Sequence, residues 1–224
     1  MATQNPTITI FLLLLATFLL QLATAKSTIE PCSNAETCSA VVGYSLYTDL
    51  KVSELAALFS VDPISLLLAN AIDISYPDVE NHILPSKLFI KIPTSCSCVA
   101  GIRKSSSIVY KTRSSDTLAS ISAAVYGGLV SADQIKEANP EAALSDPSVL
   151  NIGTKLNIPL PCTCFDNSDN NLPTIYMSYV VAPVDTLTGI AVRYATTLTD
   201  LMNVNALGNP AITEGDILAI PLSG

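Results

Sequence analysis

Charged residues are scarce in this sequence, and it contains no run of basic residues. Only 13% of its 224 residues are charged, and 11 Lys and Arg against 19 Asp and Glu leave a formal net charge of −8. A surface of this kind repels phosphate, which argues against a nucleic acid or an anionic membrane as a partner. The low charge density favours a secreted binder of an uncharged ligand over a cytosolic enzyme.

Histidine is nearly absent as well, because His82 is the only one. The cysteines recur as Cys-x-Cys in "IKIPTSCSCVAG" and "LNIPLPCTCFDN", whereas zinc sites and redox sites favour Cys-x-x-Cys. Metal and redox chemistry are therefore disfavoured, no metal or cofactor is expected, and structural disulfides remain. An even number of cysteines in a secreted chain predicts a disulfide framework, whose pairing the spacing leaves open. The six are Cys32, Cys38, Cys96, Cys98, Cys162 and Cys164.

Long hydrophobic runs are absent except at the N-terminus. The run "ITIFLLLLATFLLQLATA" ends in Ala23-Thr24-Ala25, a signal-peptidase pattern, although the preceding "MATQNP" lacks the usual basic residue. An uncleaved N-terminal anchor is the alternative. We predict a signal peptide at residues 1–25, a mature chain that begins at Lys26, and no transmembrane helix after it.

The mature chain repeats itself with a period of about 65 residues. Three segments each open on Asp and close on Asn: "DLKVSELAALFSVDPISLLLAN", "DTLASISAAVYGGLVSADQIKEAN" and "DTLTGIAVRYATTLTDLMNVN". Each is followed by an Ile-Pro ending, at Pro93, Pro159 and Pro221. The repeats predict an N-terminal cysteine segment at 26–39 and three units at 40–95, 106–161 and 176–222.

Each unit has the pattern strand, helix, helix, strand, which predicts an α+β fold. In the middle unit, "SSIVYKTR" alternates as a strand with Ile108 and Tyr110 on one face. Ser115 or Asp116 is expected to cap the first helix, "YGG" to end it, and Pro159 to end the last strand. The expected buried helix positions are Leu118, Ile121, Val125, Ala132, Ile135 and Ala138.

These residues resemble a known family. The stretch from "YKTRSSDTLASISAAVYGG" to "DPSVLNIGTKLNIPLPCTCF" is similar to the middle lysin motif (LysM) of plant LysM receptor-like proteins, a group that includes GPI-anchored LysM proteins and the chitin elicitor-binding protein. The other two repeats fit the first and third motifs. The resemblance implies three tandem βααβ modules, each with two helices on a two-stranded antiparallel sheet. It also implies three disulfides that clamp them: Cys32–Cys98, Cys38–Cys164 and Cys96–Cys162.

The resemblance further implies a function in plant innate immunity. It suggests an extracellular pattern-recognition protein that binds N-acetylglucosamine-containing glycans, peptidoglycan or chitin oligomers, with a LysM receptor-like kinase as partner. The glycan would lie in a shallow groove between two loops of the middle unit. The implied walls are Arg113, Ser114, Ser115, Asp116 and Thr117 on one side, and Asn139, Pro140, Glu141, Ala142 and Ala143 on the other.

Several of these residues also have a simpler structural interpretation. Capping of a helix would by itself explain Ser115 and Asp116, and also the equivalent Asp49 and Asp185. Asn139 can cap the turn after a helix. His82 is expected in a solvated loop, and Tyr126 is expected in the core rather than against a sugar.

The chain departs from the family pattern in two places. "PEAALS" places six residues between Asn139 and "DPS", where about three are usual, and this extra length falls in the implied groove loop. The sequence also stops at "IPLSG", without the serine-rich tail and GPI signal of the anchored relatives. We therefore expect a freely secreted protein, or a longer form anchored to the outer face of the plasma membrane.

Two other functions are alternatives. A secreted binder can mask microbial glycans without signalling, and binding to a receptor kinase distinguishes the two roles. LysM modules also accompany hydrolases, and Asp133, Glu137 and Glu141 offer carboxylates. The three repeats occupy almost the whole mature chain, however, so we expect no enzyme.

Overall fold

The computed structural model describes residues 37–99, 103–141, 150–163 and 175–222. The predicted signal peptide, Cys32, Ala142, Ala143 and Cys164 lie outside the described residues.

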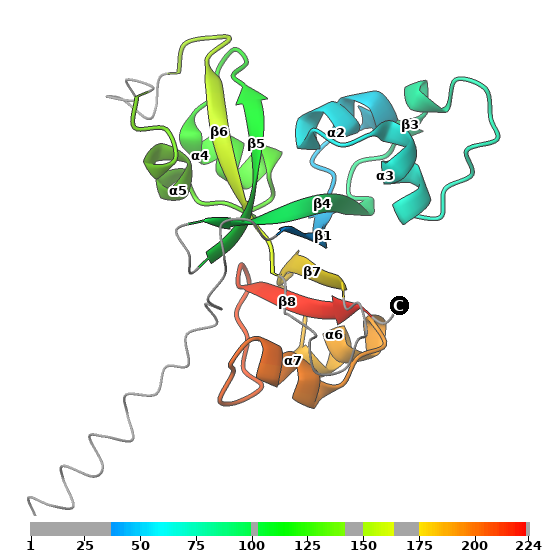
Figure 1. The fold of residues 1–224 in the computed structure, drawn as a ribbon, viewed down its shortest axis with the longest axis vertical. Helices are drawn as coiled ribbons and strands as arrows, with labels where there is room; N and C mark the ends of the chain where they lie inside the picture. Colours follow the sequence, from blue (N-terminus) through cyan, green and yellow to red (C-terminus); the bar gives the residue numbers. More distant parts are fainter. Residues whose placement is uncertain (1–36, 100–102, 142–149, 164–174, 223–224) are drawn as a thin grey trace, which may run out of the picture.

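Three successive units share one order of elements: a strand, two helices and a strand (Figure 1). The first unit contains β1 (Thr37–Ser45), β2 (Leu50–Lys51), α2 (Val52–Phe59), α3 (Pro63–Ala69), η1 (Val79–Asn81), β3 (Ile83–Leu84) and β4 (Phe89–Val99). The second contains β5 (Arg103–Lys111), α4 (Leu118–Ser120), a π-helical turn η2 (Ile121–Val125), α5 (Ala132–Glu137) and β6 (Lys155–Pro161). The third contains β7 (Ile175–Val180), α6 (Leu187–Arg193), α7 (Leu198–Val204) and β8 (Ile217–Leu222).

The three strand pairs join into one six-stranded sheet in the order β6-β5-β4-β1-β7-β8. The first and last strands of each unit are antiparallel, as expected for three separate two-stranded sheets. The pairs are nevertheless continuous, because β4 runs on through its Cys-x-Cys segment and pairs with the start of β5. A short parallel contact between β1 and β7, at Val41–Met177 and Val42–Ser178, adds the third unit.

Pro159 does not end its strand, so that prediction was wrong. β6 continues to Pro161, and Pro159 lies opposite Ser107 in the ladder with β5. β6 is an edge strand of the sheet, where proline is tolerated because one side of the strand has no partner to receive an N–H. Pro221 lies in the other edge strand, β8, in the same way.

The first and second units share one hydrophobic core. Phe59 of the first unit packs against Tyr44 and against Tyr126 of the second unit, with ring centroids 4.9 and 5.8 Å apart. The Tyr44 hydroxyl donates to the Val125 carbonyl across the same junction at 2.6 Å. Tyr126 is fully buried, which confirms it as a core residue. The two units are therefore expected to fold as one body.

The third unit has a core of its own. It contacts the first unit through Phe89 of β4, whose ring centroid lies 5.9 Å from that of Tyr179. Within the third unit, Arg193 pairs with Asp185 at 3.0 Å, and the Tyr179 hydroxyl also donates to Asp185. Burial opposes ionisation of Asp185, but these bonds and the Ala182 amide hold its pKa below its ordinary value.

A disulfide joins Cys96 of β4 to Cys162, just after β6, and confirms one predicted pairing. Both cysteines are buried, and the bridge links residues 66 positions apart, so it ties the first unit to the second. Cys38 and Cys98 are also disulfide-bonded. Their predicted partners, Cys32 and Cys164, lie outside the described residues, so those two pairings stay predictions.

An asparagine in each unit ties the second helix to the last strand. Asn139 Nδ2 donates to the carbonyls of Ile135 and Asn157, and its Oδ1 accepts the Asn157 N–H, all at 2.7 Å. Asn70 and Asn205 make the same three bonds in the first and third units. We call this arrangement the asparagine clasp. It explains why each repeat closes on Asn, since aspartate has no amide hydrogens to donate.

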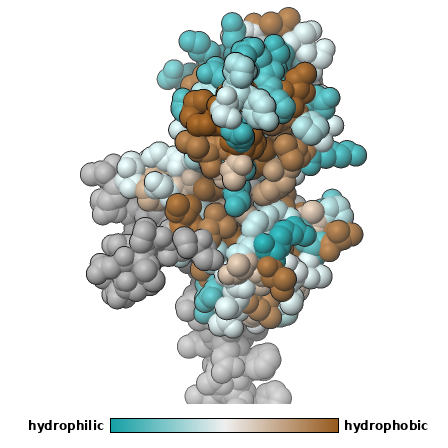
Figure 2. All heavy atoms as spheres, turned by 90° about the vertical axis from the view of Figure 1, so that its right-hand side faces the viewer, coloured by the Kyte–Doolittle hydropathy of each residue, from teal (hydrophilic) through white to brown (hydrophobic). Residues whose placement is uncertain are grey.

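Several large apolar side chains of the first unit are exposed, namely Leu68, Ile74, Tyr76 and Ile83. Figure 2, which looks at that side of the molecule, shows hydrophobic residues in groups separated by hydrophilic ones. Among the described residues, no single helix is long and apolar enough to cross a membrane. α2 and α3 meet those criteria only when taken together, across a bend of 99°.

The asparagine clasp predicts a large effect of Asn139→Ala. The substitution leaves one amide and two carbonyls without their partner, so the free energy of unfolding should fall by about 2–4 kcal/mol. Urea titration measures the change. Asn151→Ala is the matched control, because the Asn151 side chain is exposed and makes no hydrogen bond to the described residues. Equal losses for the two variants would contradict the clasp.

The shared core predicts that damage to the first unit spreads to the second. Phe59→Ala should cost about 3–5 kcal/mol. Hydrogen exchange should become faster in both units, while the third unit keeps its protection. Phe89→Ala, which removes contacts with Tyr179 and Tyr194, should instead affect the third unit. Loss of protection confined to the first unit would show that the cores are separate.

The ion pair in the third unit predicts an acid-dependent loss of stability. Because the folded pKa of Asp185 is below its ordinary value of 3.8, its carboxylate stabilises the fold above pH 3.8. That contribution is lost as the pH falls through the folded pKa. Thermal unfolding measured from pH 7 to pH 2 should give the wild type a higher midpoint temperature than Asp185→Asn at pH 7. The difference between the two midpoints should disappear below pH 3.8. Asp133→Asn, at an exposed aspartate, is the control. A difference between wild type and Asp185→Asn that stays constant down to pH 2 would refute the assignment.

Candidate functional site

The loop between β5 and α4 carries one wall of the implied groove, and Asp116 holds it together. The Asp116 carboxylate accepts the backbone N–H of Arg113 at 2.6 Å and the Tyr110 hydroxyl at 2.8 Å. Burial raises the pKa of Tyr110, and the bond to Asp116 raises it further, so Tyr110 remains a neutral donor. The Asp116 side chain therefore closes the loop from within.

Thr117 caps the first helix, so the prediction of Ser115 or Asp116 as the cap was wrong. Thr117 Oγ1 accepts the Ser120 N–H at 2.9 Å, and the Ser120 hydroxyl accepts the Thr117 N–H at 2.9 Å. Asp116 cannot serve as the cap because its carboxylate is turned back to Arg113. Ser115 lies in the turn itself, exposed and with φ +68°.

The aspartates of the other two repeats are not caps either, which corrects the same prediction there. Thr186 caps α6 through the Gly189 amide, and Asp185 binds the Ala182 amide instead. Asp49 accepts the Ser86 N–H at 2.7 Å. In the Asp-Thr pair the second residue caps the helix, and the first closes the preceding loop.

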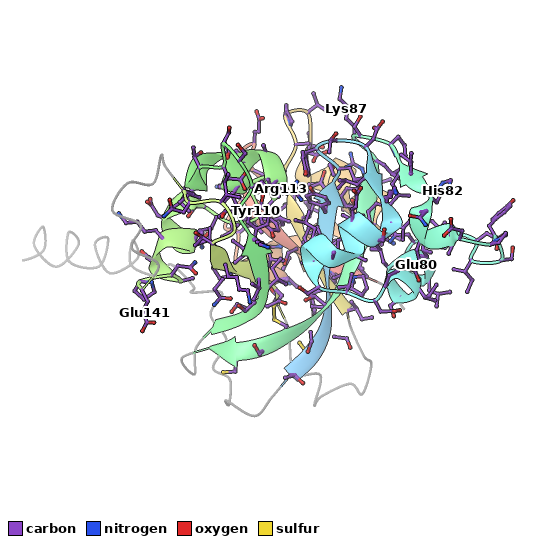
Figure 3. The ribbon with its side chains drawn as sticks, turned by 90° about the horizontal axis from the view of Figure 1, so that it is seen from above. Glu80, His82, Lys87, Tyr110, Arg113 and Glu141 are labelled. Atoms are coloured by element: carbon purple, nitrogen blue, oxygen red, sulfur yellow. A yellow bond between two sulfur atoms is a disulfide. The ribbon has the colours of Figure 1, made fainter. Side chains whose placement is uncertain are left out.

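Arg113 points away from the second wall and toward the first unit. Its Nη1 donates to the Tyr47 hydroxyl at 3.0 Å, and its guanidinium lies 5.8 Å from the centroid of the Tyr110 ring. The hydrogen bond to Tyr47 raises the pKa of Arg113. Figure 3 shows Arg113 and Tyr110 together at the centre of the molecule, between the two units.

The described part of the second wall is divided. Asn139 is buried in its clasp, whereas Pro140 and Glu141 are exposed. In Figure 3, Glu141 lies at the outer end of the second unit, apart from Arg113. The structure therefore does not bring the Arg113 and Glu141 side chains together, and Ala142 and Ala143 lie outside the described residues.

Another part of the second loop does contact the first. Thr112 donates its N–H to the Thr154 carbonyl and its hydroxyl to the Asn151 carbonyl, and its own carbonyl accepts the Gly153 N–H at 2.8 Å. Ile152, between these partners, is 73% exposed. The loop after β5 and the loop before β6 therefore meet at residues 151–154. These residues were not identified from the sequence.

A repeated backbone feature marks that contact and gives a sequence signal for it. Gly153, Gly215 and Lys87 each have positive φ and each lie two residues before the last strand of their unit. Each donates its N–H to the backbone carbonyl of the residue directly after the first strand of its unit. These acceptors are Thr112, Val181 and Leu46. Glycine occupies two of the three positions because it adopts positive φ without strain.

The histidine and the two helical carboxylates named in the sequence analysis are exposed. His82, Asp133 and Glu137 lie at the surface, and His82 is in a solvated loop as expected. Within the ranges that the structure describes, no three His, Cys, Asp or Glu side chains are placed to hold a metal ion.

An open hollow lies elsewhere, at the junction of the first and second units. It is lined largely by small hydroxyl side chains, and none of the implied groove residues borders it. The lining comes from residues 59–62, Ser65, residues 93–95, Ser97 and residues 106–108.

Comparison with known proteins shows what these units are. The LysM domain model matches residues 110–159 and 179–221. LysM domain-containing GPI-anchored protein 1 of Arabidopsis thaliana is 67% identical over 98% of this chain and 52% of its own length. The chitin elicitor-binding protein of Oryza sativa subsp. japonica is 27% identical over 85% of this chain and 52% of its own length. The chain thus spans about half the length of these relatives.

The fold is also found in a solved structure. The crystal structure of the ectodomain of a receptor-like kinase superimposes with a TM-score of 0.69 at 18% identity, covering 85% of this chain and 94% of that one. This likeness concerns the fold alone. The sequence matches go further, because they include both loops of the middle unit and nearly the whole chain. They identify the chain as a LysM-domain protein of the group that includes the plant GPI-anchored LysM proteins and the chitin elicitor-binding protein.

Proposed function

We propose that this protein binds N-acetylglucosamine-containing glycans, chitin oligomers or peptidoglycan, outside the cell and acts as a co-receptor in plant innate immunity. The observation that carries the proposal is the LysM match over residues 110–159, which contain both loops implied to hold the glycan. A relative that is named for chitin-elicitor binding supports the chitin class of ligand.

The geometry of the middle unit suits a neutral ligand. Among the described loop residues, the Asp116 carboxylate and the Asn139 amide are already bonded within the protein. Ser114 and Ser115 are exposed and uncharged, and so are available to a sugar. The LysM resemblance also implies that backbone amides and carbonyls of these loops bind the N-acetyl groups. Both serines are therefore proposed contacts, together with Arg113, Thr117 and residues 140–143.

The module count extends the proposal to the whole architecture. The first unit has the same order of elements, asparagine clasp and positive-φ turn as the two units that match the LysM model. We propose that it is a third LysM module, with Cys32–Cys98 and Cys38–Cys164 completing the clamp. We assign no catalytic role, since the relatives above are named as binding and GPI-anchored proteins.

The cellular role follows from the same relatives. A protein 67% identical to this chain is named as GPI-anchored, so we propose the outer face of the plasma membrane as the site of action. A LysM receptor-like kinase is the proposed partner, because the chain shares its fold with a receptor-like kinase ectodomain. Association with such a kinase separates this role from simple masking of glycans.

Titration calorimetry of the protein, with its disulfides confirmed, tests the proposal against chitin oligomers and soluble peptidoglycan fragments. Ser114→Trp should weaken binding by about tenfold or more, close to 1.4 kcal/mol, because the indole occupies the space above the loop. Ser75→Trp is the matched control, since Ser75 is an exposed serine of the first unit. Absence of heat with both ligands would refute glycan binding, and equal affinity for both variants would place the site elsewhere.

A further inference from the structure

The sugar-binding loop proposed above is braced by a residue from the neighbouring unit. Arg113 belongs to that loop, yet its guanidinium donates to the Tyr47 hydroxyl of the first unit at 3.0 Å. The two residues lie 66 positions apart in the sequence. Through this contact, the position of the loop in the second unit depends on the position of the first unit.

The contact belongs to a closed set of interactions that holds Arg113 at both ends. Its side chain lies over the Tyr110 ring and reaches Tyr47, while its backbone N–H is held by Asp116. Asp116 in turn accepts the Tyr110 hydroxyl. The side chain of Arg113 and the backbone of its loop are therefore fixed by the same group of residues.

Hydrogen bonds of neighbouring residues hold the backbone at Tyr47 in place. Leu46, the residue before it, donates its N–H to the Leu88 carbonyl and accepts the Lys87 N–H. Tyr44, three residues earlier, is buried and bonded to Val125 of the second unit. The Tyr47 hydroxyl is thus held in register with the second unit by the shared core beneath it.

The third unit shows the same loop without this external brace. Its Tyr179–Asp185 pair corresponds to Tyr110–Asp116, with the same six-residue separation. There the arginine comes from the unit's own helix α6, since Arg193 bonds both Asp185 and Tyr179. In the middle unit the only comparable arginine in the described residues, Arg113, is directed to the first unit instead.

We propose that Tyr47 is a positioning residue for the sugar-binding loop 113–117 and acts through Arg113, so that the middle site is assembled from two units. This inference rests on the proposed function for its ligand. Tyr47 and Arg113 are both exposed, and a hydrogen bond that water can replace contributes little net stability. The effect of Tyr47 is therefore on loop geometry and affinity rather than on folding.

Tyr47→Phe in the full chain tests the inference, because it removes only the hydroxyl that accepts from Arg113. Affinity for a chitin oligomer should fall about three- to tenfold, which corresponds to the net contribution of one ordinary hydrogen bond. The thermal midpoint should stay unchanged, and amide exchange of residues 112–118 should become faster. Tyr76→Phe is the control, since Tyr76 is a 67% exposed tyrosine of the same unit.

A double-mutant cycle shows whether Tyr47 acts through Arg113. In an Arg113→Gln background, Tyr47→Phe should have no further effect on affinity or on loop exchange. Additive losses, or unchanged exchange of residues 112–118 in Tyr47→Phe alone, would overturn the inference. If the wild type binds neither glycan, the proposed function fails, while the exchange measurement still decides whether Tyr47 positions the loop.

Discussion

The junction between the first and second units is the constraint on which the rest of the structure depends. A unit of some 50 residues buries little apolar surface and is marginal by itself. Here Phe59, Tyr44 and Tyr126 form one aromatic cluster across the junction, and the Cys96–Cys162 disulfide joins the two units covalently. The two units therefore share one hydrophobic core, which fixes the relative position of the surface loops above it.

The three units use one architecture with different loops. The asparagine clasp and the positive-φ turn before the last strand recur in all three, because both satisfy backbone N–H and C=O groups of the fold. The loop after the first strand differs. In the second and third units a tyrosine bonds an aspartate six residues later, whereas Asp49 follows Tyr44 by only five. The Tyr44 hydroxyl is thereby free to cross the junction and bind Val125.

Local patterns predicted what local interactions determine. The alternation around Ile108 and Tyr110, the helical spacing of Leu118, Ile121 and Val125, and the glycines that end that helix all agree with the structure. The identity of the helix cap could not be read in this way, since Asp116 and Thr117 are both good caps and only the contacts of Asp116 decide between them. Pro159 misled for a similar reason. Whether proline ends a strand depends on whether the strand has a neighbouring strand on both sides. That depends on the order of strands in the whole sheet.

The candidate site was harder to predict because its side chains serve the fold first. Sequence similarity assigns residues to a groove from their place in the alignment with the family. It does not show that Arg113 is directed toward Tyr47, or that the side-chain amide of Asn139 is already hydrogen-bonded in the clasp. A loop whose polar side chains are satisfied internally presents a pre-organised backbone and small hydroxyls. Such a surface loses little conformational entropy on binding a neutral sugar, and it needs no charge to orient the ligand. In the proposed function, the scarcity of charge in the sequence and the internal bonding of Asp116 and Asn139 serve the same end, because the affinity for a neutral ligand would then depend on how firmly the loops are held.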